Sequence, residues 1–289
     1  MATESQQPCD GIVDSHQHFI DVNRFKYYWV RPDKPILQRS YLPNDLEPLL
    51  RANGVRQTIV VQAHPSVEEA EWLLALADAH PFIAGIVPWV DLTASNIKTL
   101  LDRYVKIPKV RSVRYTLVED MPADTLLRKD VLNGLESVAR SGLPYDLLLR
   151  WHHLPSVPVA LRKVPGLKTV VEHIAKPDIA TRRMQPWADE IAAVAEFPDV
   201  FCKISGMVTE ADHARWTADD LRPYVQHVVK CFGFERIMWG SDWPVCLLAA
   251  SYDRVLSSTL EAIGTMTVEQ RTRFLRSNAS RFYGLDKVV

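Results

Sequence analysis

Two histidines separated by one residue, His16 and His18, are the side chains near the N-terminus best suited to chemistry. They end an apolar run that starts at Gly11 and is typical of a buried strand. Residues i and i+2 of an extended strand project from the same face, so both imidazoles point the same way, with Asp14 beside them if the strand runs straight. Because imidazole suits zinc and similar cations, the pair predicts one edge of a metal site. The alternative is an accidental pair at a strand end, satisfied by water or by the backbone.

Composition narrows the class of protein. The 289 residues, 47% of them hydrophobic, are enough for one large α/β domain or two average ones. The formal net charge is −1 and the basic residues are dispersed, so we expect a small-molecule partner rather than nucleic acid or a membrane. The four cysteines form no CxxC pair and no apolar leader or membrane-length apolar run is present, which indicates a cytoplasmic protein with reduced thiols.

Short apolar runs alternate with amphipathic segments along the whole chain. Strands are expected at 11–19, 57–62, 82–90, 110–117, 144–149, 167–172, 200–204 and 236–240. Helices are expected at 43–52, 66–79, 94–104, 125–140, 187–196, 218–232, 252–263 and 268–276. A further short helix is expected after the strand 144–149, ending at residue 163. Apolar strands between helices predict a parallel sheet covered on both faces.

Eight such strands in a chain of this length favour a closed (β/α)8 TIM barrel of the α/β class. In an open doubly wound sheet, a glycine-rich phosphate-binding turn would be expected after the first strand, where this chain has histidines. We therefore predict a single domain over residues 1–289. Within it, 20–41 forms a flap-like insertion and 268–289 a C-terminal extension.

Active sites of such barrels lie at the carboxyl ends of the strands. Beyond the first strand, those ends carry many polar and aromatic side chains: Gln62, His64, Trp89, Asp91, Arg114, Arg150, His152, His153, Glu172, His173, Lys203, Ser205, Ser241, Asp242 and Trp243. Of the nine histidines, only His80, His213 and His227 fall elsewhere. Most of the imidazoles are therefore expected at one end of the barrel.

Five segments carry a resemblance to a known family. They are 14–19 (DSHQHF), 171–177 (VEHIAKP), 203–206 (KISG), 238–245 (MWGSDWPV) and 278–284 (NASRFYG). In this order they resemble the amidohydrolase superfamily of metal-dependent hydrolases. The branch they are most similar to is that of the lactonases, which includes 2-pyrone-4,6-dicarboxylate lactonase, L-fuconolactonase and L-rhamnonolactonase.

The resemblance implies a metal site and its ligands. It implies that His16, His18 and Asp242 bind one divalent cation, Zn2+ or Mn2+, and that His173 faces the same pocket as the fourth expected ligand. The branch usually has Asp-His where this chain has Glu172-His173, which leaves the role of the glutamate open. Arg114 stands where binuclear members of the superfamily carry a carboxylated lysine, so a bridged two-metal centre is not expected. A metal-free mechanism is the alternative.

The resemblance also implies hydrolysis of a lactone of a sugar acid or small dicarboxylic acid. A bound cation would polarise the ester carbonyl and acidify water. Asp242 would act as general base and then deliver the proton to the leaving alkoxide, with His173 beside it as a second catalytic residue. Without a metal, the three histidines would donate hydrogen bonds to the oxyanion. The alternatives are that Asp242 only caps a turn and that His173 is a buried structural residue.

A further set of residues is predicted to contact the substrate: Arg114, Gln62, His64, Arg150, His153, Lys176, Trp29, Tyr28 and Trp243. Arg114 is the best candidate to hold a carboxylate, because a guanidinium makes two parallel hydrogen bonds. For Arg150 and Lys176, an equally good alternative to substrate binding is that they are solvated or salt-bridged cations. For His153 the alternative is that it caps a helix. Phe282 and Tyr283 are expected to be packing residues.

Two other functions stay open at this point. The first is a non-oxidative decarboxylase, because related barrels remove CO2 from aromatic acids with a similar set of metal ligands. The second is a barrel that binds a sugar acid without turnover, in which the histidines and Asp242 would have no catalytic role. The sequence leaves open which lactone is used and whether the protein forms a homo-oligomer.

Overall fold

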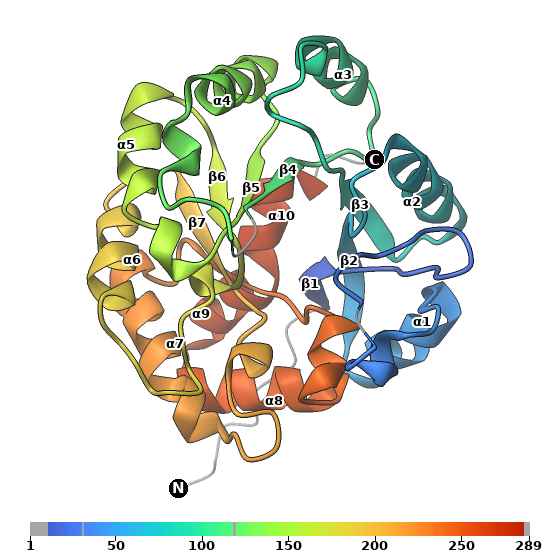
Figure 1. The fold of residues 1–289 in the computed structure, drawn as a ribbon. Coiled ribbons are helices and arrows are strands. Elements are labelled where there is room, and N and C mark those ends of the chain that lie inside the picture. Colours follow the sequence, from blue (N-terminus) through green and yellow to red (C-terminus); the bar gives the residue numbers. More distant parts are fainter. Residues whose placement is uncertain (1–10, 31, 118–119, 286–289) are drawn as a thin grey trace, which may run out of the picture.

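The computed structural model describes residues 11–30, 32–117 and 120–285, and these contain eight parallel strands (Figure 1). The strands are β1 (Ile12–Gln17), β2 (Val55–Val61), β3 (Ile83–Val87), β4 (Val113–Thr116), β5 (Tyr145–Leu148), β6 (Thr169–Val171), β7 (Val200–Ile204) and β8 (Ile237–Trp239). They form two sheets, one of β1 to β3 and one of β4 to β8. Within each sheet, every strand pairs with the next one in chain order.

The two sheets meet at both of their edges. Parallel bridges between Ile86 and Val110 and between Trp89 and Arg114 join the ends of β3 and β4. A bridge between Gln17 and Trp243 joins β1 to the segment after β8. The strands therefore close into a ring, and the predicted (β/α)8 barrel is confirmed.

Helices cover the outside of this ring (Figure 1). Among the described residues they are α1 (Pro43–Ala52), α2 (Val67–Ala79), α3 (Ile97–Tyr104), α4 (Lys129–Ser141), α5 (Ser156–Lys163), α6 (Trp187–Ala195), α7 (Ala218–Phe232) and α8 (Tyr252–Ile263). Two of these helices start with a local side-chain hydrogen bond: at α2 the Ser66 hydroxyl accepts from Glu69 N at 3.1 Å, and at α7 Asp220 accepts from Thr217 N at 2.9 Å. No helix in this part of the chain is both long and apolar enough to cross a bilayer.

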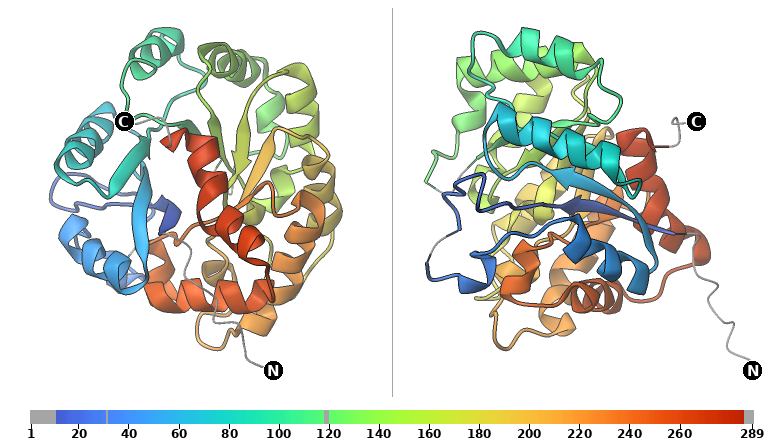
Figure 2. Two further views of the ribbon diagram at one scale, coloured as in Figure 1. Left: turned by 180° about the vertical axis from the view of Figure 1, so that it is seen from behind. Right: turned by 90° about the vertical axis from the view of Figure 1, so that its right-hand side faces the viewer.

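The prediction that the last helix stops at residue 276 is wrong. Helix α9 (Val268–Thr272) continues through a π-helical turn, Arg273–Ser277, into α10 (Asn278–Tyr283). An Asn-Ala-Ser sequence suggests a helix end, but the Asn278 amide is buried and donates to the Phe234 and Ile237 carbonyls, both at 2.7 Å. Seen from behind, this final helix lies across one end of the barrel (Figure 2).

Helix α10 closes that end with apolar side chains. Phe282 and Tyr283 belong to one buried cluster with Val13 of β1 and Phe201 of β7, and the Phe201 and Phe282 rings lie 5.1 Å apart. The C-terminal segment is therefore part of the packed barrel interior.

The segment 20–41 has a closed base. Ile20 and Tyr41 pair as an antiparallel bridge, with backbone hydrogen bonds of 3.0 and 2.7 Å. Trp29 donates its indole N–H to the Ala63 carbonyl just beyond β2 at 3.0 Å, so the described part of the segment leans on the carboxyl end of the barrel. That it acts as a flap, and that the chain is one domain, stay predictions.

Phe282→Ala tests whether α10 is integral to the fold. Phe282 is 1% exposed, and removing a buried phenylalanine costs about 3–5 kcal/mol of the free energy of unfolding. Val268→Ala, at a position 67% exposed in α9, should change it by less than about 0.5 kcal/mol. Chemical denaturation measures both. Equal effects of the two substitutions would show that α10 is not part of the core.

Candidate functional site

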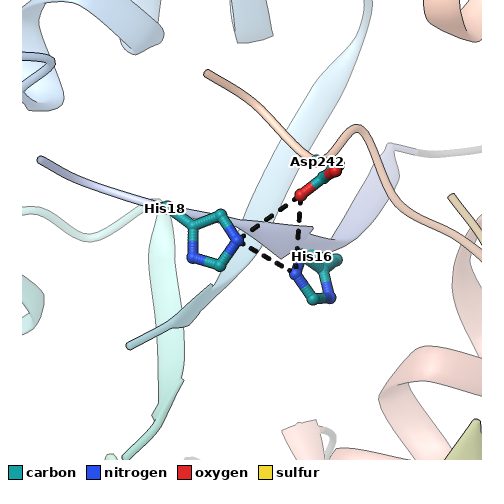
Figure 3. A group of neighbouring side chains, drawn as sticks. All are labelled: His16, His18 and Asp242. Atoms are coloured by element: carbon teal, nitrogen blue, oxygen red, sulfur yellow. Dashed lines mark hydrogen bonds and ion pairs between the residues drawn. The ribbon is translucent and has the colours of Figure 1, made fainter. Parts of the chain in front are cut away.

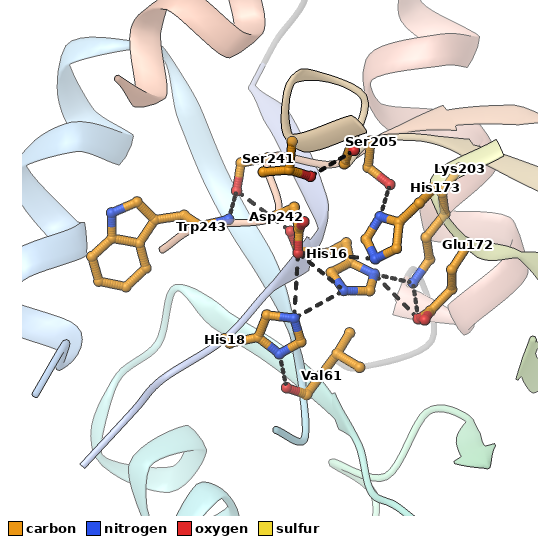
Figure 4. Close-up of polar contacts among 12 residues, drawn as sticks. His16, His18, Val61, Glu172, His173, Lys203, Ser205, Ser241, Asp242 and Trp243 are labelled. Carbon is orange, nitrogen blue, oxygen red and sulfur yellow. Dashed lines mark hydrogen bonds and ion pairs between the residues drawn. The ribbon is translucent and has the colours of Figure 1, made fainter. Parts of the chain in front are cut away.

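Three histidines surround one carboxylate oxygen at the carboxyl end of the barrel (Figure 4). Figure 3 shows two of them, His16 and His18, with Asp242. His16 lies in β1 and His18 directly after it, His173 follows β6 and Asp242 follows β8. The Oδ1 atom of Asp242 lies 3.4 Å from His18 Nε2, 3.7 Å from His16 Nε2 and 3.9 Å from His173 Nε2. The Nε2 atoms of His16 and His18 are 3.2 Å apart. The structure thus brings together all four side chains predicted as metal ligands.

The closing of β8 against β1 places Asp242 beside the histidine pair. Asp242 N donates to the His16 carbonyl at 2.8 Å, and His18 N donates to the Trp243 carbonyl at 2.6 Å. Asp242 itself has a left-handed backbone, with φ of 58°. Such a conformation costs a residue with a Cβ about 1–3 kcal/mol and persists where the surroundings enforce it, which these hydrogen bonds do.

A second left-handed stretch positions His173. Four consecutive residues after β6, from His173 to Lys176, have positive φ values. The imidazole packs against Gly206, where a Cβ would lie only 2.5 Å from His173 Nδ1. Glycine after β7 is thus required both by its own φ of 61° and by the close approach of the ring.

Each histidine has an outer partner that orients it (Figure 4). His18 Nδ1 lies 2.6 Å from the Val61 carbonyl, which only accepts, so this nitrogen carries the proton. His173 Nδ1 contacts the Ser205 hydroxyl at 2.9 Å, and His16 Nδ1 contacts Glu172 Oε1 at 3.2 Å. Bonds of this kind leave the Nε2 lone pair free for a ligand and fix the ring.

The electrostatics of the site keep His16 and His173 neutral and the Asp242 carboxylate charged. Burial lowers the pKa of His173 to about 4, although Asp242 opposes the shift. Burial likewise lowers the pKa of His16 well below its ordinary value, against the effect of Glu172. Burial on its own raises the pKa of Asp242, but His173, His18 and His16 together hold it below its usual range. Neutral imidazoles and an ionised carboxylate are the states that bind metals.

This donor set fits one divalent cation. Ligand atoms of His16, His18 and Asp242 all lie within 4.8 Å of one another, and so do those of His16, Glu172 and His173. Three imidazoles and a carboxylate, all buried and with ordered outer partners, match the chemistry of zinc and similar metals.

Charged residues that were not predicted as site residues lie directly behind the histidines. Glu172 binds His16 with Oε1 and Arg114 Nη1 with Oε2 at 3.0 Å. The Lys203 ammonium lies 3.3 Å from Glu172 Oε1, 3.2 Å from His16 Nδ1 and 2.6 Å from Asp146 Oδ2. A lysine inside the apolar strand 200–204 was the sequence signal for this cluster.

Asp14 does not join the other site residues. Asp14 is expected beside the histidines only if the strand runs straight. It does not, because the pairing of β1 shifts register between Asp14 and Gln17. Its carboxylate accepts instead from Ser241 N at 2.9 Å and from the Tyr252 hydroxyl at 2.9 Å. It holds the turn after β8 in place.

A cavity of about 310 Å³ opens at the donors. It is lined by His18, His173 and Asp242 and by five of the predicted substrate residues, Tyr28, Trp29, Arg114, Arg150 and Lys176. Lys34, which the sequence did not single out, lines it as well. Arg150 and Lys176 both bind Glu210, at 3.1 and 3.4 Å, so a carboxylate from beyond β7 pairs these two cations.

Gln62 and His64 line a neighbouring cavity of about 340 Å³, which shares Tyr28 and Arg114 with the first. The Gln62 side chain is 1% exposed, donates to the Ser66 carbonyl at 2.6 Å and accepts from Trp89 N at 2.7 Å. It therefore braces the loop after β2.

The structure does not bring two of the predicted substrate residues, His153 and Trp243, to these cavities. His153 is fully buried and its ring nitrogens lie 3.3 Å from Arg150 N and 3.2 Å from the Met121 carbonyl, so it caps a local turn. Trp243 is 1% exposed and packs edge-on against Phe19 and Tyr41. Neither lines either cavity, because both side chains point into the packing around the barrel rim.

Known proteins resemble this chain in both sequence and structure. L-fucono-1,5-lactonase of Burkholderia ambifaria is 34% identical over 282 residues, which cover 95% of this chain and 96% of the relative. L-fucono-1,5-lactonase of Burkholderia multivorans is 33% identical and covers 94% and 96%. A crystal structure of an amidohydrolase from Burkholderia multivorans with bound zinc superposes with a TM-score of 0.86 at 33% identity, over 95% of this chain and 99% of that one.

The family model described as amidohydrolase matches residues 13–285. This range holds the described barrel through α10 except for Ile12, the first residue of β1, and it includes all four converging side chains. By the extent of this match and the identity of its relatives, the chain belongs to the amidohydrolase family.

Proposed function

We propose that this protein is a lactonase, a hydrolase that opens the lactone ring of a sugar acid by adding water. The observation that carries the proposal is the convergence of His16, His18 and His173 on the Asp242 carboxylate at the floor of an open cavity. The lactonase names of two relatives, which match 95% and 94% of the chain, support it.

The four converging side chains are the proposed ligands of one divalent cation, zinc or manganese. When bound, such an ion polarises the ester carbonyl and lowers the pKa of water. The bound zinc in the Burkholderia multivorans structure supports zinc as the first choice. The outer contacts at Nδ1 would leave Nε2 of each histidine available to hold such an ion.

Asp242 is the proposed general base. Its pKa lies below the usual range, so its carboxylate is ionised at neutral pH and accepts a proton from the attacking water. The water oxygen forms a bond to the acyl carbon, the ring C–O bond breaks, and Asp242 returns the proton to the leaving alkoxide. His173, whose Nε2 lies 3.9 Å from Oδ1 and which lines the same cavity, is the second proposed catalytic residue.

Substrate binding is assigned to the cavity wall. Arg114 is held by Glu172 and by the Gln62 carbonyl. Its fixed guanidinium is thereby presented to a hydroxyl or carboxylate of the substrate. Arg150 and Lys176, paired through Glu210, are proposed to bind hydroxyls on the opposite side of the ring. Tyr28 and Trp29 supply an aromatic wall.

The decisive experiment is a pH-indicator assay of the purified protein against a panel of aldonolactones and dicarboxylate lactones. We expect proton release with sugar-acid lactones and a loss of about 10²–10⁴-fold in kcat for Asp242→Asn, because general-base catalysis is worth that much. Asp91→Asn is the matched control, since Asp91 also follows a barrel strand but its carboxylate accepts from Thr93. Proton release unaffected by Asp242→Asn would refute the mechanism. CO2 release from an aromatic acid, with no lactone turned over, would refute the function.

Removal of the metal gives a second prediction. Exhaustive dialysis against a chelator should abolish turnover, and added Zn2+ or Mn2+ should restore it, because the carbonyl then regains its polarising ion. The metal content of each sample is measured by atomic emission. Full turnover by a sample without metal would mean that the histidines act as hydrogen-bond donors alone.

The lowered pKa of His173 predicts how cation binding depends on pH. Protonation of His173 blocks its coordination, and its pKa is lowered to about 4. The Zn2+ affinity of the wild type should therefore exceed that of His173→Asn by a constant factor from about pH 7 to about pH 5, and the factor should shrink as the pH approaches 4. Competition with a chromophoric chelator measures both affinities. A factor that already falls between pH 7 and 6 would show an ordinary histidine pKa.

A further inference from the structure

The barrel interior holds a chain of polar contacts from the C-terminal helix to the histidine site. The Tyr283 hydroxyl of α10 donates to Asp146 Oδ2 of β5 at 2.7 Å, and the same oxygen accepts from Lys203 Nζ at 2.6 Å. Lys203 continues to Glu172 Oε1 at 3.3 Å and to His16 Nδ1 at 3.2 Å. Every residue in this chain is at most 2% exposed, so solvent does not replace a lost contact.

The charges along this chain are balanced. Lys203 and Arg114 face Asp146 and Glu172, two cations against two anions, all buried. Breaking a buried ion pair leaves the partner charge unpaired and is strongly destabilising. The positions of the four groups are therefore coupled, and the ammonium of Lys203 is the member that touches both carboxylates and the imidazole.

We propose that Lys203, held by Asp146 and Tyr283, is a positioning residue for His16, so that α10 at one end of the barrel tunes cation binding at the other. Lys203 fixes Glu172 Oε1, the oxygen that orients His16 through Nδ1. Asp146 fixes the ammonium, and the Tyr283 hydroxyl fixes the carboxylate oxygen that holds it. Outer contacts of this kind change metal affinity because they set the direction of the ligating lone pair. The inference rests on the proposed cation site and does not depend on which substrate is hydrolysed.

Tyr283→Phe is the informative substitution, because it removes one hydroxyl and leaves all four charges in place. Lys203→Met and Asp146→Asn unbalance the buried charges and risk unfolding. Tyr224→Phe is the matched control: it removes a hydroxyl that donates to the Asp178 carbonyl at 3.3 Å, outside the barrel interior. Thermal unfolding of the metal-free proteins measures how much stability each substitution removes.

The test measures Zn2+ affinity by competition with a chromophoric chelator, and the visible spectrum of the Co2+-loaded protein as a report on ligand geometry. We expect Tyr283→Phe to weaken Zn2+ binding by roughly 10-fold, at the lower end of outer-contact effects on metal sites, and to shift the Co2+ bands. Tyr224→Phe should leave both unchanged.

Three outcomes decide the matter. A lower Tm for Tyr283→Phe with unaltered Zn2+ affinity and Co2+ spectrum would overturn the proposal, since the hydroxyl would then be structural only. A wild-type protein that binds neither ion would overturn it as well. Tight binding that weakens in Tyr283→Phe, together with no turnover of any lactone, would uphold the positioning role and reject the lactonase function.

Discussion

The site depends above all on the hydrogen bonds that join the turn after β8 to β1. Through them the last strand of the barrel closes on the first, and residues more than 220 positions apart, His16 and Asp242, come within 4 Å. Asp14 takes part by accepting from Ser241 N. Closure of the barrel and assembly of the site are thus one event, because the same backbone bonds that complete the ring place the carboxylate among the imidazoles.

A second constraint is the polar interior of the barrel. Apolar side chains fill the end near α10, whereas lysine, arginine and carboxylates fill the space between that cluster and the histidines. Burying such charges is costly unless each one is paired, and here each one is. The hydrogen bonds that satisfy them also fix the side chains of the site, so order at the site follows from the need to compensate buried charge.

Much of this arrangement could be predicted from the sequence. The alternation of apolar runs and helices identified the barrel, and the polar strand ends identified His16, His18, His173 and Asp242 as neighbours. Long-range partners could not be predicted. That Gln62 would turn to its own loop, that Trp243 would pack on Phe19, and that the last helix would continue to Tyr283 depend on contacts between distant segments. The periodicity of a single sequence does not encode such contacts.

The paired base of the segment 20–41 has a consequence for the wall of the cavity. Ile20 and Tyr41 lock the two ends of the segment together, while Tyr28, Trp29 and Lys34 between them reach the cavity. The four converging donors all come from other parts of the chain. The segment therefore borders the cavity without supplying any of the four donors. A change of side chain between its paired ends would alter the cavity wall and leave the donors where they are.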